Sequence, residues 1–145
     1  MTFTKGDLTQ PGKSNVQTLP LTSGTITKGN FVRVVGGNTV ALATATSTAA
    51  GVYVALETRT FAAGSVEDVQ CAMAGTFVVV DAGGVIAPGG LVKIETGSAE
   101  VIAATTASDI NNGYVVGRYV KHANEDIATP AADLDTDCII LLGAI

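Results

Sequence analysis

The sequence contains no tryptophan, one histidine and two cysteines, and only 14% of its 145 residues are charged. An average soluble domain has about 25% charged residues. The longest apolar run, residues 138–145, is far shorter than the roughly 20 residues that cross a bilayer, so we expect no membrane partner. At 47% hydrophobic residues the chain is nevertheless too apolar for an intrinsically disordered protein, and its length suits one domain with its own core.

The charged residues that are present are mostly acidic. Eight Lys and Arg stand against 13 Asp and Glu, which gives a net charge of −5, and the basic residues are scattered singly. Nucleic-acid binding requires a cationic track that displaces counterions from the phosphates. We therefore expect no nucleic-acid partner.

The residues that could carry out chemistry are few and lie far apart in the sequence. The start of the chain lacks the apolar stretch of a secretory signal, so we expect Cys71 and Cys138 to be buried thiols rather than a disulfide. His122 has no serine or cysteine nucleophile motif near it. We therefore expect that the protein is not an enzyme and has no catalytic residue.

Three aspartates, Asp133, Asp135 and Asp137, have the alternating spacing with which a calcium loop begins. Such a loop needs glycine at its sixth position and glutamate at its twelfth, where this chain has Cys138 and Ala144. On an extended segment the three carboxylates instead share one solvent face.

The glycine-rich sequences GGN, AGG and PGG lack the phosphate-binding patterns and are predicted to be turns. We therefore expect no metal site and no cofactor.

The abundant residues are those that favour β-strands. The chain has 18 valines, 19 threonines and 9 isoleucines, which is nearly a third of its length. Residues 31–35 and 39–42 flank the turn sequence Gly36-Gly37-Asn38 and are predicted to form a hairpin. Further strands are predicted at residues 51–55, 67–73, 76–81, 91–95, 99–103, 114–120 and 138–142.

The sequence also repeats itself approximately at a spacing of about sixty residues. Phe31-Val32-Arg33-Val34 matches Leu91-Val92-Lys93-Ile94, Gly37 matches Gly97, and Gly51-Val-Tyr-Val matches Gly113-Tyr-Val-Val. Unless these matches arise by chance in Val- and Gly-rich sequence, they predict two similar β units, residues 29–80 and 89–145, that pack on each other. The predicted fold is all-β, a small sandwich or barrel-like domain of the β-tulip or β-clip kind, spanning residues 25–145.

Residues 1–24 differ from the rest of the chain. They are rich in Thr, Pro, Gly, Ser and Gln, they show no helical or alternating period, and Pro11 and Pro20 disfavour both a helix and a central strand. We predict an extended N-terminal arm, with a frayed terminus as the alternative. Its isolated apolar side chains are candidates to fill pockets on a partner: Phe3, Leu8, Val16, Leu19 and Leu21.

Residues 50–80 resemble the capsid decoration proteins of tailed phages, which are also called head-stabilising or cement proteins. The resemblance lies in the strand Ala50-Gly51-Val52-Tyr53-Val54, in the polar loop after it, and in a later strand marked by Gly75-Thr76-Phe77. The hairpin at residues 32–42 is also similar to the lambda-type decoration protein and to related small β-rich head proteins. This chain departs from the lambda-type protein in its length, its duplication and its lack of tryptophan.

The resemblance implies a viral structural protein that binds the outer surface of an expanded capsid and stabilises contacts between neighbouring major capsid subunits. The implied partners are the major capsid protein and further copies of this chain, as a homotrimer on the shell. The implied location is the outside of the virion, after synthesis in the host cytoplasm. The arm residues Phe3, Leu8, Val16, Leu19 and Leu21 would then bind the capsid. Two alternatives stay open: another virion part, such as a tail or head-completion protein, and a β-rich adhesion or sugar-binding module.

Overall fold

The computed structural model describes residues 3–10, 12, 14–44, 51–63, 67–87, 89–95, 97, 99–123 and 136–143. Strands dominate this part of the chain, beside a short α-helix and a turn of 3-10 helix at Gly36–Asn38. The elements are β1 (Val16–Leu21), β2 (Thr25–Ile26), β3 (Phe31–Val35), β4 (Thr39–Leu42), β5 (Val52–Ala55), β6 (Arg59–Thr60), β7 (Glu67–Ala72), β8 (Phe77–Ala82), β9 (Leu91–Ile94), β10 (Glu100–Ala103), α1 (Ala107–Asn111), β11 (Val115–His122) and β12 (Thr136–Leu142).

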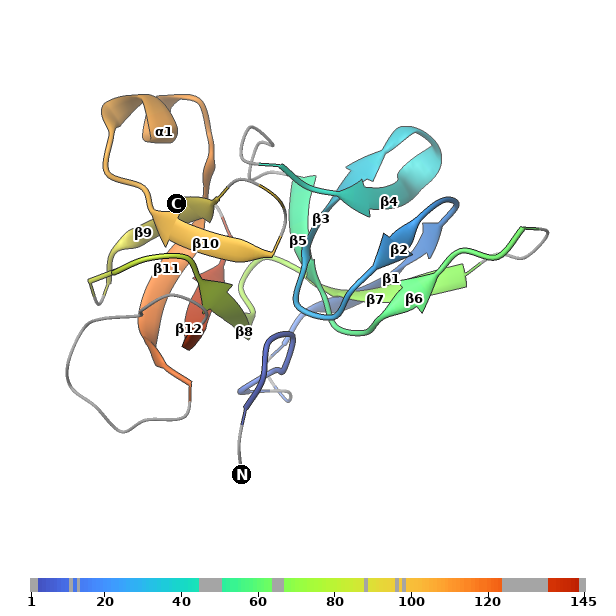
Figure 1. The fold of residues 1–145 in the computed structure, drawn as a ribbon, viewed down its shortest axis with the longest axis horizontal. Coiled ribbons are helices and arrows are strands. Elements are labelled where there is room, and N and C mark those ends of the chain that lie inside the picture. Colours follow the sequence, from blue (N-terminus) through green and yellow to red (C-terminus); the bar gives the residue numbers. More distant parts are fainter. Residues whose placement is uncertain are drawn as a thin grey trace.

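Most of these strands close into two five-stranded barrels, which lie next to each other along the long axis of the molecule (Figure 1). Barrel 1 has the strand order β1-β4-β3-β5-β7, and barrel 2 has the order β8-β10-β9-β11-β12. The short strands β2 and β6 pair with each other beside barrel 1. The prediction of an all-β, small barrel-like domain is confirmed, and the structure shows that it contains two closed barrels.

The two barrels follow one structural plan. In each, the first strand in the chain pairs in parallel with the third, and the other neighbouring strands pair antiparallel. The turn before the second strand also recurs: Gly29 N donates to Ala55 O at 2.8 Å, and Gly89 N donates to Tyr119 O at 2.8 Å. Both glycines have positive φ, 87° and 75°, a conformation that favours glycine. The correspondence therefore extends from the strand order to single hydrogen bonds.

The units begin one strand earlier than the sequence repeat suggests. β8 falls at the end of the predicted unit 29–80, but it is the first strand of barrel 2. β1 lies within the predicted arm, yet it pairs with all six of its residues to β7 of barrel 1, so this part of residues 1–24 is not an arm in the structure. Pro20 is accommodated because β4 pairs with β1 only at Leu21, and proline is tolerated where a strand has an open edge.

Barrel 1 has a core of its own and also shares a core with barrel 2. Leu21, Val69 and Cys71 belong to a cluster inside barrel 1. A larger cluster combines the interior of barrel 2 with side chains on the outer face of barrel 1, among them Phe31 and Val54, which have no exposed surface. Packing the barrels together removes apolar side chains of both from water, and the favourable free energy grows roughly in proportion to the area removed. This shared core therefore joins the two barrels.

Two buried hydroxyl groups differ in whether they form hydrogen bonds. Thr76 precedes β8, and its Oγ1 donates to Asn15 O at 3.1 Å and accepts from Asn15 N at 3.0 Å. This exchange ties the start of barrel 1 to the start of barrel 2. The hydroxyl of Tyr119, inside barrel 2, has no hydrogen-bond partner within the described part of the chain. Burial raises the pKa of Tyr119, and the neighbouring Cys138 adds to this effect.

We predict that removing the Thr76 hydroxyl destabilises the protein and that removing the Tyr119 hydroxyl does not. Thr76→Val leaves Asn15 N without its acceptor, whereas Asn15 O still accepts from Met73 N at 2.8 Å. The substitution should lower the free energy of unfolding by about 1–3 kcal/mol. Tyr119→Phe removes a buried hydroxyl that makes no bond, so stability should stay unchanged or rise. Urea denaturation followed by circular dichroism measures both changes. An equal loss of stability in the two variants would contradict this account.

Candidate interaction surface

Residues 3–10, which we call the N-terminal strap, lie along the outside of barrel 2. Gly6 N donates to Val79 O at 2.7 Å, and Val79 N donates to Asp7 O at 3.0 Å. β10 pairs only with the last two residues of β8, so the first half of β8 would otherwise have an open edge. The strap fills this edge with main-chain hydrogen bonds, which removes a place where another strand could add.

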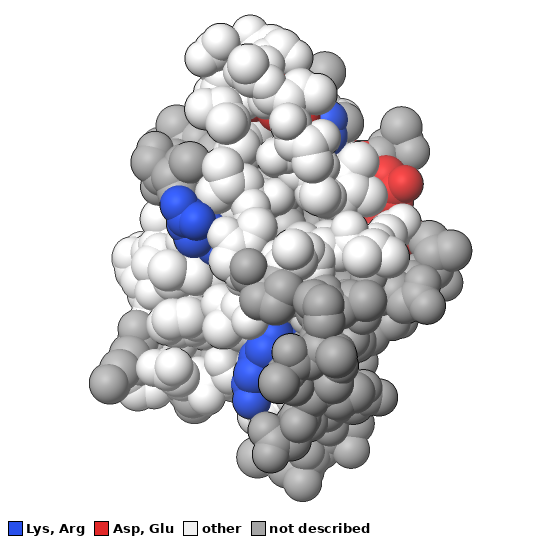
Figure 2. Space-filling model, turned by 90° about the vertical axis from the view of Figure 1, so that its left-hand side faces the viewer, with Lys and Arg blue, Asp and Glu red and all other residues white. Residues whose placement is uncertain are grey.

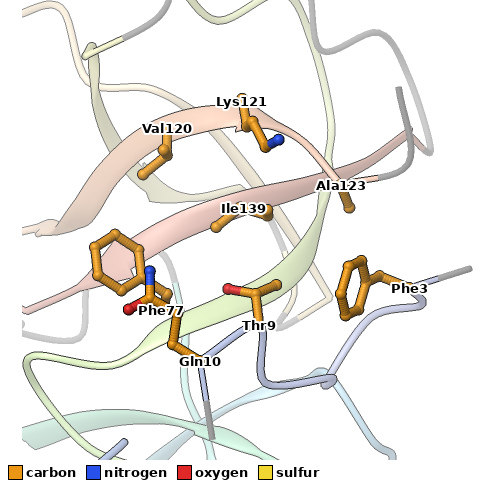
Figure 3. A pocket seen from close by; sticks show the side chains of 8 residues that line it. All are labelled: Phe3, Thr9, Gln10, Phe77, Val120, Lys121, Ala123 and Ile139. Carbon is orange, nitrogen blue, oxygen red and sulfur yellow. The ribbon is translucent and has the colours of Figure 1, made fainter. Parts of the chain in front are cut away.

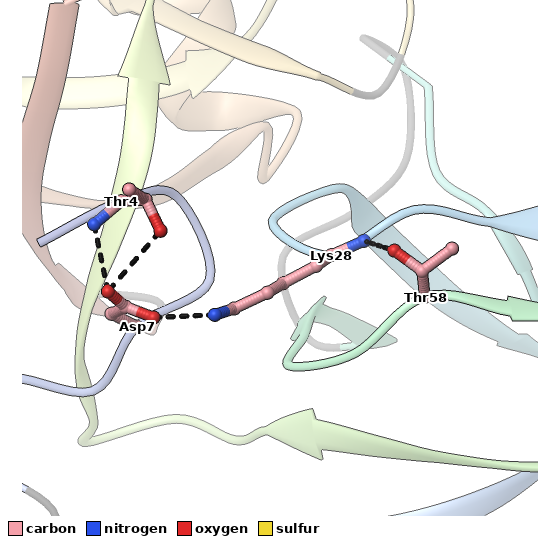
Figure 4. A network of polar contacts seen from close by, with 4 residues as sticks. All are labelled: Thr4, Asp7, Lys28 and Thr58. Carbon is pink, nitrogen blue, oxygen red and sulfur yellow. Dashed lines mark hydrogen bonds and ion pairs between the residues drawn. The ribbon is translucent and has the colours of Figure 1, made fainter.

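Asp7 connects the strap to barrel 1 (Figure 4). Its carboxylate accepts hydrogen bonds from Thr4 N at 2.8 Å and from Lys28 Nζ at 2.6 Å, and Lys28 N donates to Thr58 Oγ1 at 3.0 Å. Partial burial acts to raise the pKa of Asp7, but the hydrogen bonds from Lys28 and Thr4 outweigh it, so this pKa is lower than usual. The strap therefore holds both barrels, barrel 2 through its backbone and barrel 1 through an ion pair.

Two glycines allow the strap to approach barrel 1 closely. Gly6 and Gly29 both have positive φ, 84° and 87°. A Cβ atom at Gly6 would lie 2.9 Å from Gly29 N, and a Cβ atom at Gly29 would lie 2.6 Å from Lys5 Cγ. Real Cβ contacts are longer than these distances, so a side chain at either position would push the strap away from the turn that contains Gly29.

The strap covers an apolar face that barrel 1 does not have. Val79 of β8 and Ile139 of β12 are cross-strand neighbours on the outer face of barrel 2, and both are buried. The equivalent cross-strand pair in barrel 1 is Thr18 and Gln70, and both of these side chains are exposed. The two repeats have therefore diverged at this face, which is polar and open in one barrel and apolar and covered in the other.

An open hollow of about 290 Å³ remains beside the strap (Figure 3). Figure 3 shows the rings of Phe3 and Phe77 on opposite sides of it, with Ile139 between them. Val120 is 39% exposed at this site, and Lys121 is the one charged residue among the described residues that line it. A mostly apolar hollow with few polar groups suits an apolar side chain of another molecule. The lining consists of Phe3, Thr9, Gln10, Phe77, Val120, Lys121, Ala123 and Ile139.

The five residues predicted to bind a capsid lie in different environments. Leu21 is completely buried inside barrel 1, and Leu19 is half-buried against the same core. Leu8 is half-buried against the shared core, Phe3 is half-buried on the outside of barrel 2, and Val16 is 36% exposed. Only Phe3 lines the hollow. Leu21 can contact another protein only if β1 leaves its barrel, so the five residues do not form one surface.

The two cysteines are buried thiols rather than a disulfide, as predicted, and one lies inside each barrel. Burial, with a smaller contribution from Glu57, raises the pKa of Cys71 to about 12. Because the thiolate is the reactive form, Cys71 is an inert thiol at neutral pH in the folded protein.

The other residues considered for chemistry do not form a described site. His122 is the last residue of β11 and Asp137 lies in β12, while Asp133 and Asp135 fall outside the described residues. Across the described ranges, His, Cys, Asp and Glu side chains form no group of three that could hold a metal ion. Within the same ranges, no helix has the length and apolar character needed to cross a membrane.

The helix α1 was not expected from the sequence, although its start carries a recognisable signal. Thr106 Oγ1 accepts a hydrogen bond from Asp109 N at 3.2 Å, and Asp109 accepts one from Thr106 N at 3.4 Å. This reciprocal pair is a capping box, which a Thr-x-x-Asp sequence can indicate. Lys93 Nζ also donates to Asp109 at 2.8 Å, and these hydrogen bonds lower the pKa of Asp109. The helix is thereby fixed to β9.

Comparison with protein-family models, with curated proteins and with solved structures finds no match to this chain.

We predict that Gly6→Ala detaches the strap without unfolding the barrels. The added Cβ meets Gly29 and Lys28, and the positive φ of Gly6 becomes unfavourable. Amide hydrogen exchange at Gly6 and Thr9 measures the loss of the strap hydrogen bonds, and binding of an apolar dye measures exposure of the covered face. Gly12→Ala is the matched control, because nothing lies within 4 Å of a Cβ atom there. Unchanged strap protection in Gly6→Ala would contradict the proposed fit.

Proposed function

We propose that the protein is a structural component of a phage virion, a decoration protein that binds the outside of the expanded capsid and stabilises contacts between neighbouring major capsid subunits. The observation that carries the proposal is the apolar hollow between the strap and barrel 2, which lies on an outer face of the molecule. The resemblance of residues 50–80 to decoration proteins supports it independently. In the structure this stretch contributes β5, β6, β7 and the start of β8.

The hollow gives the proposal a physical mechanism. An apolar side chain of a capsid subunit that fills it would bury its own surface together with that of Phe3, Phe77 and Val120. Burying one such side chain contributes about 1.5–3 kcal/mol. Closed barrels leave few strand edges free, so binding through side chains on an outer face suits this fold better than strand addition does.

The repeated geometry of a capsid would multiply such a weak single contact. In the proposed assembly the chain acts as a homotrimer, so that three hollows bind neighbouring major capsid subunits at once. Linked sites gain overall affinity without any new contact, because the second binding event is effectively intramolecular. The net charge of −5 fits a position on the outer surface, away from the packaged nucleic acid.

Co-sedimentation with expanded, undecorated heads of the phage that encodes the chain tests the proposal. We predict saturation at a copy number in step with the shell lattice, together with higher resistance of the heads to heat. Val120→Asp should weaken binding at least about tenfold, because it places a charge in the apolar hollow. Val85→Asp is the control, since Val85 is 68% exposed and lies outside the hollow.

Each of the other outcomes contradicts the proposed capsid-binding function. A handful of bound copies per head would indicate a vertex, tail or head-completion component. The absence of binding would overturn the proposal. Equal effects of the two valine substitutions would show that the hollow is not the contact.

A further inference from the structure

A row of three cross-strand neighbours shows how this fold docks one barrel onto another. Phe31, Val54 and Ala72 lie side by side on the outer face of barrel 1, on β3, β5 and β7. All three are completely buried in the core that barrel 1 shares with barrel 2. The outer face of β3, β5 and β7 is therefore the docking face of barrel 1.

The equivalent row in barrel 2 is not covered in this way. It consists of Leu91, Arg118 and Leu141, which pair across β9, β11 and β12 in the same register. Arg118 is exposed, and the two leucines are half-buried. β9 and β11 lie on the side of barrel 2 that is remote from barrel 1 (Figure 1). The two docking faces therefore point the same way along the molecule, and none of the described residues buries the second face as barrel 2 buries the first.

Among the described residues of barrel 2, the exposed charged side chains are few and basic. Figure 2 shows this end of the molecule as largely uncharged, with separate basic side chains and little acidic surface. Arg118 and Lys121 are both exposed, whereas the basic Lys93 forms an ion pair with Asp109. An uncharged surface that contains half-buried leucines and an arginine has the composition of a protein interface rather than of an ordinary solvent face.

The opposite end of the molecule carries acidic residues. The beginning of β7 lies at the far end of barrel 1, next to the short strand β6 (Figure 1). Asp68 is exposed there and Glu67 is half-buried, while the exposed Arg59 forms an ion pair with Glu57 at 3.2 Å. Three carboxylates thus stand against one guanidinium at this end. Basic and acidic side chains at opposite ends of one molecule favour association of copies end to end.

We propose that the row of Leu91, Arg118 and Leu141 binds the acidic end of barrel 1 of a second copy of this chain, so that copies associate head to tail. A two-fold contact between two such rows would place Arg118 against Arg118, which like-charge repulsion disfavours. A head-to-tail contact instead repeats the direction in which barrel 1 already docks on barrel 2. Such contacts close into rings or extend into chains. This inference does not rest on binding to a capsid.

Charge reversal tests the proposal in the isolated full-length protein. Sedimentation velocity over a range of concentrations should show self-association that weakens as salt is raised. Arg118→Glu and Asp68→Lys should each weaken it at least about tenfold, because each places like charges in contact. The double variant Arg118→Glu with Asp68→Lys restores opposite charges and should recover association. Arg33→Glu is the control, since Arg33 is an exposed base on β3 and belongs neither to the row nor to β6 or β7.

The outcomes are decisive because folding is checked separately by circular dichroism for every variant. A wild-type protein that stays monomeric at all concentrations overturns the proposal, as do single variants that associate like wild type. A folded double variant that fails to recover association also overturns it. Co-sedimentation with heads is scored independently, so failure of self-association and failure of capsid binding are distinguishable.

Discussion

The packing of the outer face of barrel 1 against barrel 2 is the constraint on which the rest of the structure depends. Each barrel is built from only about sixty residues, and a domain of that size buries too little surface to be more than marginally stable. The shared core solves this problem by burying the row of Phe31, Val54 and Ala72. The strap and the hydrogen bonds between Asn15 and Thr76 then fix an arrangement that apolar burial has already favoured.

The two barrels share one structural plan but differ in their outer faces. Strand order, register and turn hydrogen bonds are common to both, since these hold any one barrel together. The outer faces have changed because they meet different surroundings. Val54 in the shared core corresponds to the exposed Arg118, and the exposed Thr18 corresponds to Val79 beneath the strap. Function in such a protein resides in these outer faces rather than in the common scaffold.

Much of the fold could be predicted from sequence because its signals are local. The hairpin of β3 and β4 follows from two β-branched runs around Gly36-Gly37-Asn38, and the match of Phe31 with Leu91 identifies equivalent strands. β1 could not be predicted, since Pro20 disfavours a strand and only long-range pairing with β7 compensates. The hollow could not be predicted either, because the residues that line it are far apart in the sequence, in the strap, in β8, in and just after β11, and in β12.

Native-state hydrogen exchange of β3 and β12 tests most directly whether the shared core makes the two barrels one unit. If it does, the slowest amides of both strands exchange with the same opening free energy. Phe31→Ala then lowers both values together, by about 3–5 kcal/mol. Separate opening free energies for β3 and β12, with only that of β3 changed by the substitution, would contradict the account.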